Sequence, residues 1–334
     1  MAKYELVVNG LDNAWRKEYG CGCARCRDAR RTANTSVSLL GWSDEGQLER
    51  HLLIDAGGGV GESLLENPAL QQFPRLDGVL LTHWHTDHVC ELFRIAIGFM
   101  RSRKRQNLPL QTIPLWLREG SRRWLEREQP GILGIMKVTS SLEFEPVGRL
   151  LAPTTFERPD LSITPVTLNH SSADLMPPHG TEPLPCCAGF ILETQSFKAA
   201  LLWDVDATNL WLENPAPEQR QAFEKLRHCD LLLIDTNTWT YSQNPDGTPA
   251  SHISFALVQR FARALEPKIT YLMHLSGHED AVGDGFSWTN ETWQLEATKA
   301  WQAAGLIGEV RIARIGERIA LEPRPIQAPS LRAP

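Results

Sequence analysis

The stretch LLTHWHTDHVCEL (80–92) places three histidines and one aspartate within six positions, directly after an apolar run. Side chains alternate along an extended segment, so His83 and His85 are expected to point to the same side. Asp87 and His88 then lie at the turn into a helix, where they can bind a second ion beside the first. Imidazole and carboxylate groups suit zinc, manganese or iron. The stretch therefore predicts a metal site where a strand passes into a helix.

Four further residues with metal-binding side chains stand at the ends of predicted strands. They are His170, Asp204, Asp235 and His274, and each closes an apolar run. Apolar strand interiors are buried, so polar residues at the strand ends meet at one rim of a sheet. We therefore expect these side chains to converge on the histidine-rich stretch. Asp235 is expected to orient a metal ligand rather than to bind an ion itself.

Apolar runs of strand length recur along the chain, with fewer helical patterns between them. Helical periodicity occurs at 89–101, 216–228 and 253–265. Many strands with fewer helices favour an α/β fold in which a two-layered sheet core carries helices on its outside. The predicted strands are 4–8, 35–42, 51–57, 77–83, 161–170, 188–194, 198–204, 230–236, 268–274 and 309–321.

The patterns favour one domain over residues 1–321. The stretch 101–150 is rich in Arg, Trp and Leu, and we interpret it as a helical insertion that shapes a substrate pocket. Residues 322–334 are proline-rich, which is typical of a poorly ordered tail.

The composition is that of a soluble globular protein: of 334 residues, 42% are hydrophobic and 22% charged. The net charge of −6 argues against nucleic-acid binding driven by overall charge. The first residues lack the pattern of a signal peptide, and no apolar run approaches the roughly 20 residues of a membrane helix. We therefore expect a cytoplasmic protein without a membrane partner.

Three of the seven cysteines are crowded into CGCARC (21–26). In a cytoplasmic setting such crowding favours metal binding over disulfides. Cys21, Cys23 and Cys26 together supply three thiolates, one fewer than a tetrahedral structural zinc requires.

The motif THWHTDH (82–88) resembles the signature of the metallo-β-lactamase superfamily, and the later motifs follow in that family's order. The resemblance implies an αββα sandwich with a metal site at one rim. A hydroxide held between two such ions is a nucleophile at neutral pH, because metal binding lowers the pKa of water. The implied ligands are His83, His85 and His170 for a first ion and Asp87, His88 and His274 for a second, with Asp204 shared.

The shared position has two candidates, because LLWDVDA (201–207) contains both Asp204 and Asp206. Asp204 directly ends the apolar run and is the favoured one. Asp206 stays open as the alternative.

The cysteine motif upstream of the histidine signature is similar to that of two groups within the superfamily. One is the phosphoribosyl cyclic phosphate phosphodiesterase, and the other is the pyrroloquinoline quinone biosynthesis protein B. In both, the resemblance implies a structural zinc completed by a histidine after the last catalytic ligand, and His278 is the matching position. In the phosphodiesterase group a further histidine precedes the penultimate helix. His252 matches it and would protonate the leaving group, unless it or Ser251 only caps the helix at 253–265.

The function favoured is metal-dependent hydrolysis of a phosphodiester, with a small cyclic phosphate or nucleotide-like ester as the partner and two active-site divalent ions (Zn, Mn or Fe). Asp87 and His252 are the predicted catalytic residues. One alternative is an enzyme of cofactor or natural-product biosynthesis, similar to the quinone protein B and using iron. The other is a metal-stabilised binding protein without turnover. Related enzymes imply a homodimer.

Overall fold

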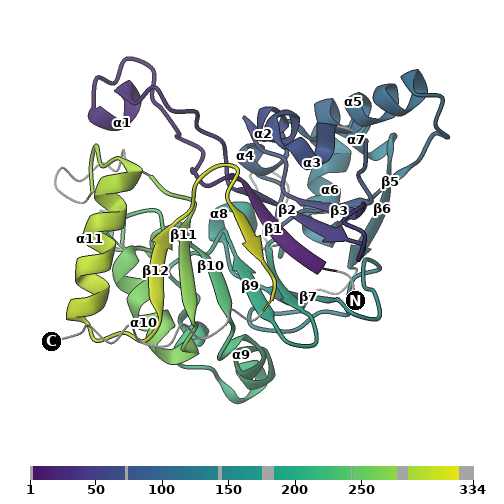
Figure 1. Ribbon diagram of the computed structural model, residues 1–334. Helices are drawn as coiled ribbons and strands as arrows, with labels where there is room; N and C mark the ends of the chain where they lie inside the picture. Colours follow the sequence, from purple (N-terminus) through teal and green to yellow (C-terminus); the bar gives the residue numbers. More distant parts are fainter. Residues whose placement is uncertain are drawn as a thin grey trace, which may run out of the picture.

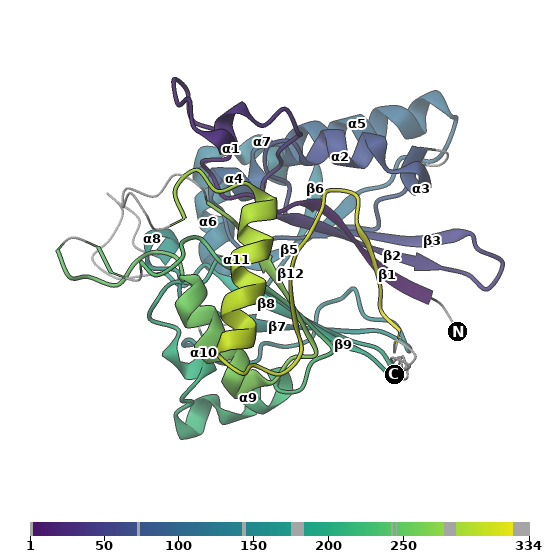
Figure 2. The same ribbon diagram turned by 60° about the vertical axis from the view of Figure 1, so that its left-hand side comes forward.

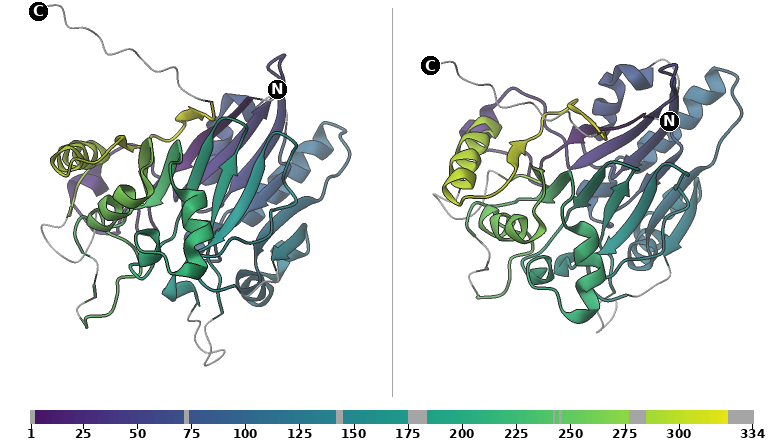
Figure 3. Two further views of the ribbon diagram at one scale, coloured as in Figure 1. Left: turned by 90° about the horizontal axis from the view of Figure 1, so that it is seen from below. Right: turned by 60° about the horizontal axis from the view of Figure 1, so that its bottom comes forward.

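The computed structural model describes residues 3–71, 74–141, 145–174, 184–241, 243–244, 246–276 and 285–322. Within these ranges the chain forms two β-sheets that lie face to face, with helices on both outer sides (Figure 1, Figure 2). Views from below show the same layering (Figure 3). The predicted αββα sandwich is confirmed.

The first sheet is formed by the N-terminal strands. The last strand of the described chain joins the sheet at one edge, where it pairs with the first strand. β1, β2 and β3 are antiparallel neighbours, whereas β3, β4, β5 and β6 run parallel. In spatial order the strands are β13 (Arg318–Ala320), β1 (Lys3–Gly10), β2 (Ser36–Trp42), β3 (Leu48–Ile54), β4 (Gly78–Leu80), β5 (Ile113–Arg118) and β6 (Met136–Ser141).

The second sheet is built from the C-terminal half of the chain. β9, β10, β11 and β12 run parallel, so their carboxyl ends lie at the same rim, and β7 and β8 complete the sheet in antiparallel pairing. In spatial order the strands are β12 (Glu309–Ile312), β11 (Ile269–Met273), β10 (Leu231–Asp235), β9 (Lys198–Leu202), β8 (Ala188–Glu193) and β7 (Ser162–Thr167).

Helices cover the outer face of each sheet (Figure 1). On the first sheet lie α2 (Val60–Glu66), α3 (Pro68–Gln71), α5 (Leu92–Arg105), α6 (Glu119–Glu128) and α7 (Pro130–Leu133). On the second lie α9 (Arg220–Leu226), α10 (Phe255–Leu265) and α11 (Asn290–Ala303). The remaining short helices are α1 (Ala24–Arg27), α4 (Thr86–Val89) and α8 (Ser171–Asp174), with 3-10 turns at Leu210–Leu212 and Pro217–Gln219.

Alternation along the strands explains the layering. In β3, Leu52 and Ile54 face the core between the sheets, while Leu53 faces the helices on the outer side. In β5, Trp116 faces inward, while its neighbours Leu115 and Leu117 face outward. Strands buried on both faces read as continuous apolar runs, because neither set of side chains contacts water.

Two sequence-based predictions are wrong in detail. The stretch 101–150 is not a helical insertion: β5 and β6 continue the first sheet there, with α6 and α7 between them. The predicted strand 309–321 is two strands, β12 and β13, which belong to different sheets. Gly316, with φ of 85°, lies in the turn between them, a conformation that glycine adopts without steric cost.

In the described part of the chain, no helix is long and apolar enough to cross a membrane. Of the predicted tail 322–334, residues 323–334 lie outside the described residues.

Candidate metal centre

The histidine-rich stretch lies where β4 passes into α4, as predicted. β4 ends at Leu80 and α4 begins at Thr86, so His83 and His85 occupy the connecting segment and His88 lies in the helix. His83 and His88 are fully buried, and His85 is half-buried. The helix is anchored to the end of β3, because the backbone N–H of Ala56 donates to the His88 carbonyl at 2.7 Å.

The first group of side chains is formed by His83, His85, His170 and Asp204, with one potential ligand atom from each within 4.8 Å of the others. His170 follows β7, and its Nδ1 donates to the Ser251 carbonyl at 3.0 Å. That hydrogen bond leaves Nε2 directed to the centre, 3.2 Å from Nδ1 of His85.

The second group is formed by Asp87, His88, Asp204 and His274, again with potential ligand atoms within 4.8 Å of one another. Nε2 of His274 lies 3.3 Å from Oδ2 of Asp87 and 3.2 Å from Oδ1 of Asp204. Nε2 of His88 lies 3.3 Å from Oδ2 of Asp204. The Asp204 carboxylate therefore stands between the two groups and belongs to both.

The donor atoms of this cluster fit divalent metal ions. Nε2 of His83, Nε2 of His88 and Oδ1 of Asp204 are buried and make no hydrogen bond with the described residues. Buried polar atoms without partners are costly, and a cation would satisfy all three. Burial, reinforced by the charges of neighbouring histidines, holds the pKa of His83 well below its usual value. Its imidazole is therefore neutral, which is the form that binds metals.

The structure separates Asp204 from its alternative, Asp206. The Asp206 carboxylate accepts hydrogen bonds from the backbone N–H groups of Ser171 (3.0 Å) and Thr208 (2.9 Å). It also accepts from the Asn209 side chain at 3.1 Å. Asp206 thus stabilises a turn, and Asp204 is the aspartate that lies among the histidines.

Asp235 and His252 form a pair beside the two groups. Nδ1 of His252 donates to Oδ2 of Asp235 at 2.9 Å, and Oδ1 of Asp235 lies 3.7 Å from Nδ1 of His274. The His252 ring stacks on His274 with 4.7 Å between centroids, and its side chain is 20% exposed. Burial alone lowers the pKa of His252, but the charge and hydrogen bond of Asp235 outweigh it and raise this pKa to about 9.

The capping role considered for Ser251 or His252 belongs to another residue. Ser254 is the N-cap of α10, and its hydroxyl accepts from the backbone N–H of Leu257. His252 therefore reaches the metal centre without a part in starting the helix.

Asp55 is a residue of this centre that sequence reasoning missed. It follows β3 with a φ of 61°, and His274 follows β11 with a φ of 57°; such left-handed conformations are uncommon for residues other than glycine. Oδ2 of Asp55 accepts from Nδ1 of His88 at 2.8 Å and from the Trp203 indole at 2.7 Å. The rule that identified Asp204 and Asp235, a carboxylate directly after an apolar run, applies equally to Asp55.

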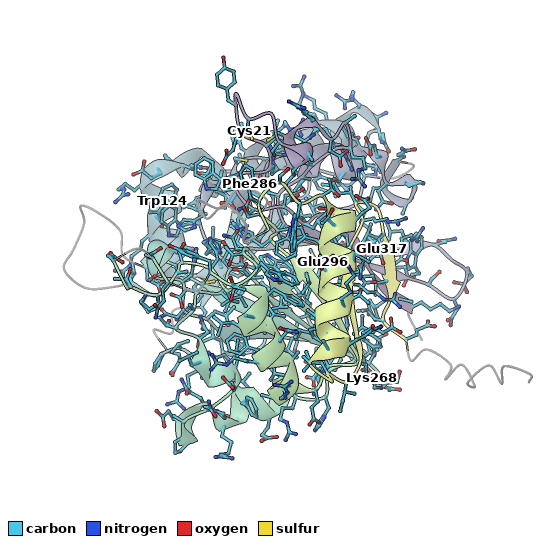
Figure 4. The ribbon with its side chains drawn as sticks, turned by 90° about the vertical axis from the view of Figure 1, so that its left-hand side faces the viewer. Cys21, Trp124, Lys268, Phe286, Glu296 and Glu317 are labelled. Carbon is cyan, nitrogen blue, oxygen red and sulfur yellow. The ribbon has the colours of Figure 1, made fainter. Side chains whose placement is uncertain are left out.

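Two tryptophans extend the wall of the centre. The indole of Trp84 lies edge-on to His85 with 4.5 Å between centroids, and it stacks on Trp124 of α6 at 4.0 Å. Both tryptophans are half-buried. Figure 4 labels Trp124. The stretch 101–150 thus contributes an aromatic side chain next to the metal centre.

The three cysteines converge as well. Cys21, Cys23 and Cys26 place their sulfurs within 4.8 Å of one another, and all three are half-buried. The segment is fixed to the start of α11, because the backbone N–H of Ala24 donates to the Ser287 hydroxyl at 2.9 Å. Cys21 and Phe286 lie at the same end of the molecule (Figure 4). His278, the predicted fourth ligand, lies outside the described residues.

Comparisons with known proteins agree with this fold. The family profile described as "Beta-lactamase superfamily domain" matches residues 50–275, more than half of the chain. A diphosphatase of the PhnP family aligns with a TM-score of 0.60 at 18% identity, over 96% of this chain and 98% of that one. Zn²⁺-bound PqqB from Methylobacterium extorquens aligns with a TM-score of 0.59 at 14% identity, over 94% and 99%.

The metallo-β-lactamase fold protein YhfI from Bacillus subtilis aligns with a TM-score of 0.59 at 15% identity, over 95% of this chain and 99% of that one. No match was found among curated proteins. At such identities a structural alignment shows a shared fold, whereas the family profile shows descent. The chain therefore belongs to the metallo-β-lactamase superfamily of metallohydrolases.

Proposed function

We propose that this protein is a phosphodiesterase that holds two divalent metal ions and hydrolyses a small cyclic phosphate or a nucleotide-like ester. The observation that carries the proposal is the position of Asp204, whose carboxylate lies within both groups of potential ligands. His83, His85 and His170 would hold one ion, Asp87, His88 and His274 the other, and Asp204 both. Ions bound there would lower the pKa of a water molecule and withdraw charge from phosphoryl oxygens.

His252 would supply the proton that the leaving oxygen needs. Its cationic form is stabilised by Asp235, to which Nδ1 donates, so Nε2 remains to donate to a substrate. The side chain is partly exposed, unlike the fully buried His83 and His88, and therefore stands where a substrate can reach it. General acid catalysis of this kind contributes on the order of 10²–10⁴ in rate.

Trp84 and Trp124 support a nucleotide-like ester in preference to a small aliphatic one. Trp84 contacts His85 directly, and Trp124 stacks against Trp84. The group esterified to the phosphate would therefore lie near these indoles. Stacking of a base on an aromatic side chain is worth about 1–3 kcal/mol.

A separate structural zinc at Cys21, Cys23 and Cys26 forms part of the proposal. Such a zinc would strengthen the attachment of the N-terminal segment to the residues before α11. Ala24 and Arg25 of this segment already donate hydrogen bonds to Ser287 and Trp288. The seven cysteines all lie in the described part of the chain and form no disulfide there, which agrees with the cytoplasmic setting that we propose.

The test combines metal analysis with a substrate screen. We expect two active-site equivalents of zinc, manganese or iron per chain, and metal-dependent turnover of bis(p-nitrophenyl) phosphate and of cyclic nucleotides. His85→Ala should abolish turnover and lower the metal content. Iron content without phosphodiester turnover would instead support a biosynthetic enzyme, and metal binding without hydrolysis of any ester would support a binding protein.

A further inference from the structure

Arg25 lies inside the cysteine motif, between Cys23 and Cys26, yet its side chain reaches the residue that follows His274. We propose that Arg25 is a positioning residue that couples the cysteine site to the metal centre. A metal ion held by the three cysteines would fix Arg25, and Arg25 fixes the loop that carries His274. This inference rests on the metal centre of the proposed function and gives the cysteine site a part in ion binding there.

The Arg25 guanidinium joins three segments of the chain. The residue is 4% exposed, and its Nη2 donates to the carboxylate of Asp12, which is itself 2% exposed. Nη2 also donates to the Leu275 carbonyl at 3.4 Å. Nη1 donates at 3.2 Å both to the Trp288 carbonyl and to the side chain of Asn290. The N-terminal segment, the loop after β11 and the start of α11 therefore meet at one buried side chain. In Figure 1, α1 lies above the start of α11.

The position of Arg25 depends on the cysteines around it. α1 is a single turn of four residues, and a helix so short is not stable by itself in water. The Cys23 sulfur caps this turn, because it accepts from the Cys26 backbone N–H at 3.4 Å. The Cys26 sulfur accepts in turn from the Glu18 N–H at 3.3 Å. An ion bound by the three sulfurs would hold both ends of the turn, and with it the direction of Arg25.

The other end of the link is the loop after β11. The Leu275 N–H donates to the Leu11 carbonyl at 2.9 Å, and the Leu275 carbonyl accepts from the Asn13 N–H at 3.1 Å. His274, the preceding residue, has a φ of 57°. A residue other than glycine keeps such a conformation only where its surroundings hold it there. The bonds to Leu275, including that from Arg25, supply this hold and so direct the His274 imidazole.

The coupling should act on one of the two ions. Asp87 belongs to the same group of potential ligands as His274, and it also rests against the N-terminal segment, because Gly57 packs between its backbone and the side chain of Asn34. In the other group, His170 is held by the loop before α10 instead. The ion held by Asp87, His88 and His274 should therefore respond to Arg25, and the ion held by the first group should not.

The experiment uses the Co²⁺-loaded protein, in which the thiolate charge-transfer band reports the cysteine site and the ligand-field bands report the histidine-rich centre. Chelator titration then measures the affinity of each ion. The double variant Asp12→Asn/Arg25→Met should weaken the second ion at least tenfold, as expected for loss of a group that orients a ligand, and leave the first ion unchanged. His85→Ala, which removes a ligand of the first group, identifies which release step belongs to which ion.

Replacing both partners keeps the test clear of folding effects. Arg25→Met alone would leave the Asp12 carboxylate buried and unpaired, whereas substitution of the pair removes both charges. The melting temperature of the double variant should stay close to that of wild type. The matched control is Arg27→Met, which removes an exposed arginine from the same turn and should change the affinity of neither ion.

A double-mutant cycle measures the coupling itself. Cys23→Ser weakens the cysteine site, so in the otherwise wild-type chain it should also weaken the second ion about tenfold. In the Asp12→Asn/Arg25→Met background the link is already broken, so Cys23→Ser should not weaken that ion further. Arg25→Lys keeps the charge but has one nitrogen in place of the fork, and it should give an intermediate affinity.

The outcomes separate this inference from the proposed function. Wild-type affinity for the second ion in Asp12→Asn/Arg25→Met would overturn the coupling alone, as would an undiminished effect of Cys23→Ser in that background. Equal weakening of both ions would show general destabilisation and would overturn it as well. A wild-type protein that holds fewer than two ions at the histidine-rich centre would instead overturn the proposed function, and the coupling with it.

Discussion

Asp55 and His88 are joined by a hydrogen bond of 2.8 Å, in which Nδ1 of the imidazole donates to the buried carboxylate. The bond fixes the ring orientation and the tautomer, so that Nε2 of His88 faces Asp204 at 3.3 Å. A residue that binds no ion itself therefore determines the direction of a ligand atom.

Asp55→Asn should weaken metal binding without removing a ligand. Loss of such outer partners typically costs about 10–100-fold in metal affinity. Chelator competition on the purified variant measures the dissociation constant, and circular dichroism reports whether the fold is kept. Wild-type affinity in a folded variant would show that Asp55 does not orient His88.

Asp204→Ala and Asp206→Ala should have opposite effects on metal content and stability. Asp204→Ala removes the carboxylate shared by both groups, so bound metal and turnover should both be lost. Asp206→Ala leaves the N–H groups of Ser171 and Thr208 without their acceptor and should cost about 1–3 kcal/mol of stability while metal content is kept. Elemental analysis and chemical denaturation distinguish the two. Loss of metal in Asp206→Ala but not in Asp204→Ala would show that Asp206 is the shared ligand.

His252→Gln should slow hydrolysis most for esters with a poor leaving group. A leaving group such as p-nitrophenolate departs without protonation, so its turnover should change little, whereas an alkyl ester should lose on the order of 10²–10⁴ in kcat. In wild type the protonated form is lost as pH rises through the pKa of His252, which Asp235 raises to about 9 and bound cations would lower. That alkaline decline should disappear in the variant. Equal losses for both esters would exclude proton donation.

Trp124→Ala should raise KM for nucleotide-like esters by about tenfold, the value of one stacked ring. Trp84 keeps its place, because its indole N–H donates to the Ala173 carbonyl at 3.0 Å. Turnover of an ester without an aromatic ring serves as the internal control and should be unchanged. If both substrates respond alike, the tryptophans support the structure only.

His51 should make the fold acid-sensitive. It is buried in β3, where Nδ1 donates to the Arg75 carbonyl at 2.7 Å and Nε2 lies 3.0 Å from the Ser38 hydroxyl. Burial lowers the pKa of His51 from 6.5 to about 4. Between these values the unfolded chain binds a proton that the folded chain does not, so stability is complete above pH 6.5 and falls toward pH 4.

The loss attributable to His51 amounts to about 3 kcal/mol, since each pKa unit is worth about 1.4 kcal/mol. His51→Gln should therefore lose less stability than wild type between pH 7 and pH 4, as measured by urea denaturation. Metal ligands also protonate in acid, but they do so in both proteins and cancel in the comparison. Parallel pH profiles would contradict the prediction.

The local sequence pattern was enough to predict that the candidate ligands meet at one rim of a sheet. It was not enough to predict which strands pair with each other. His170, Asp204 and His274 converge because each follows a strand of one sheet, and chain order alone predicts that. The pattern of 309–321 carries no sign that β12 joins one sheet and β13 the other, because pairing partners are distant in sequence. β5 was missed because a short strand buried on both faces resembles a helical apolar run. β6 was missed because it is a half-exposed edge strand whose sequence, MKVTSS, is mostly polar.

The backbone contact between Ser251 and His170 has a mechanical consequence. The carbonyl of Ser251 accepts from Nδ1 of His170, and the next residue along the chain is His252. The loop that carries the proposed proton donor is thereby tethered to a candidate ligand, and it cannot shift to admit a larger substrate without turning that imidazole. We therefore expect substitutions that loosen this loop to broaden substrate choice and to weaken metal binding at the same time.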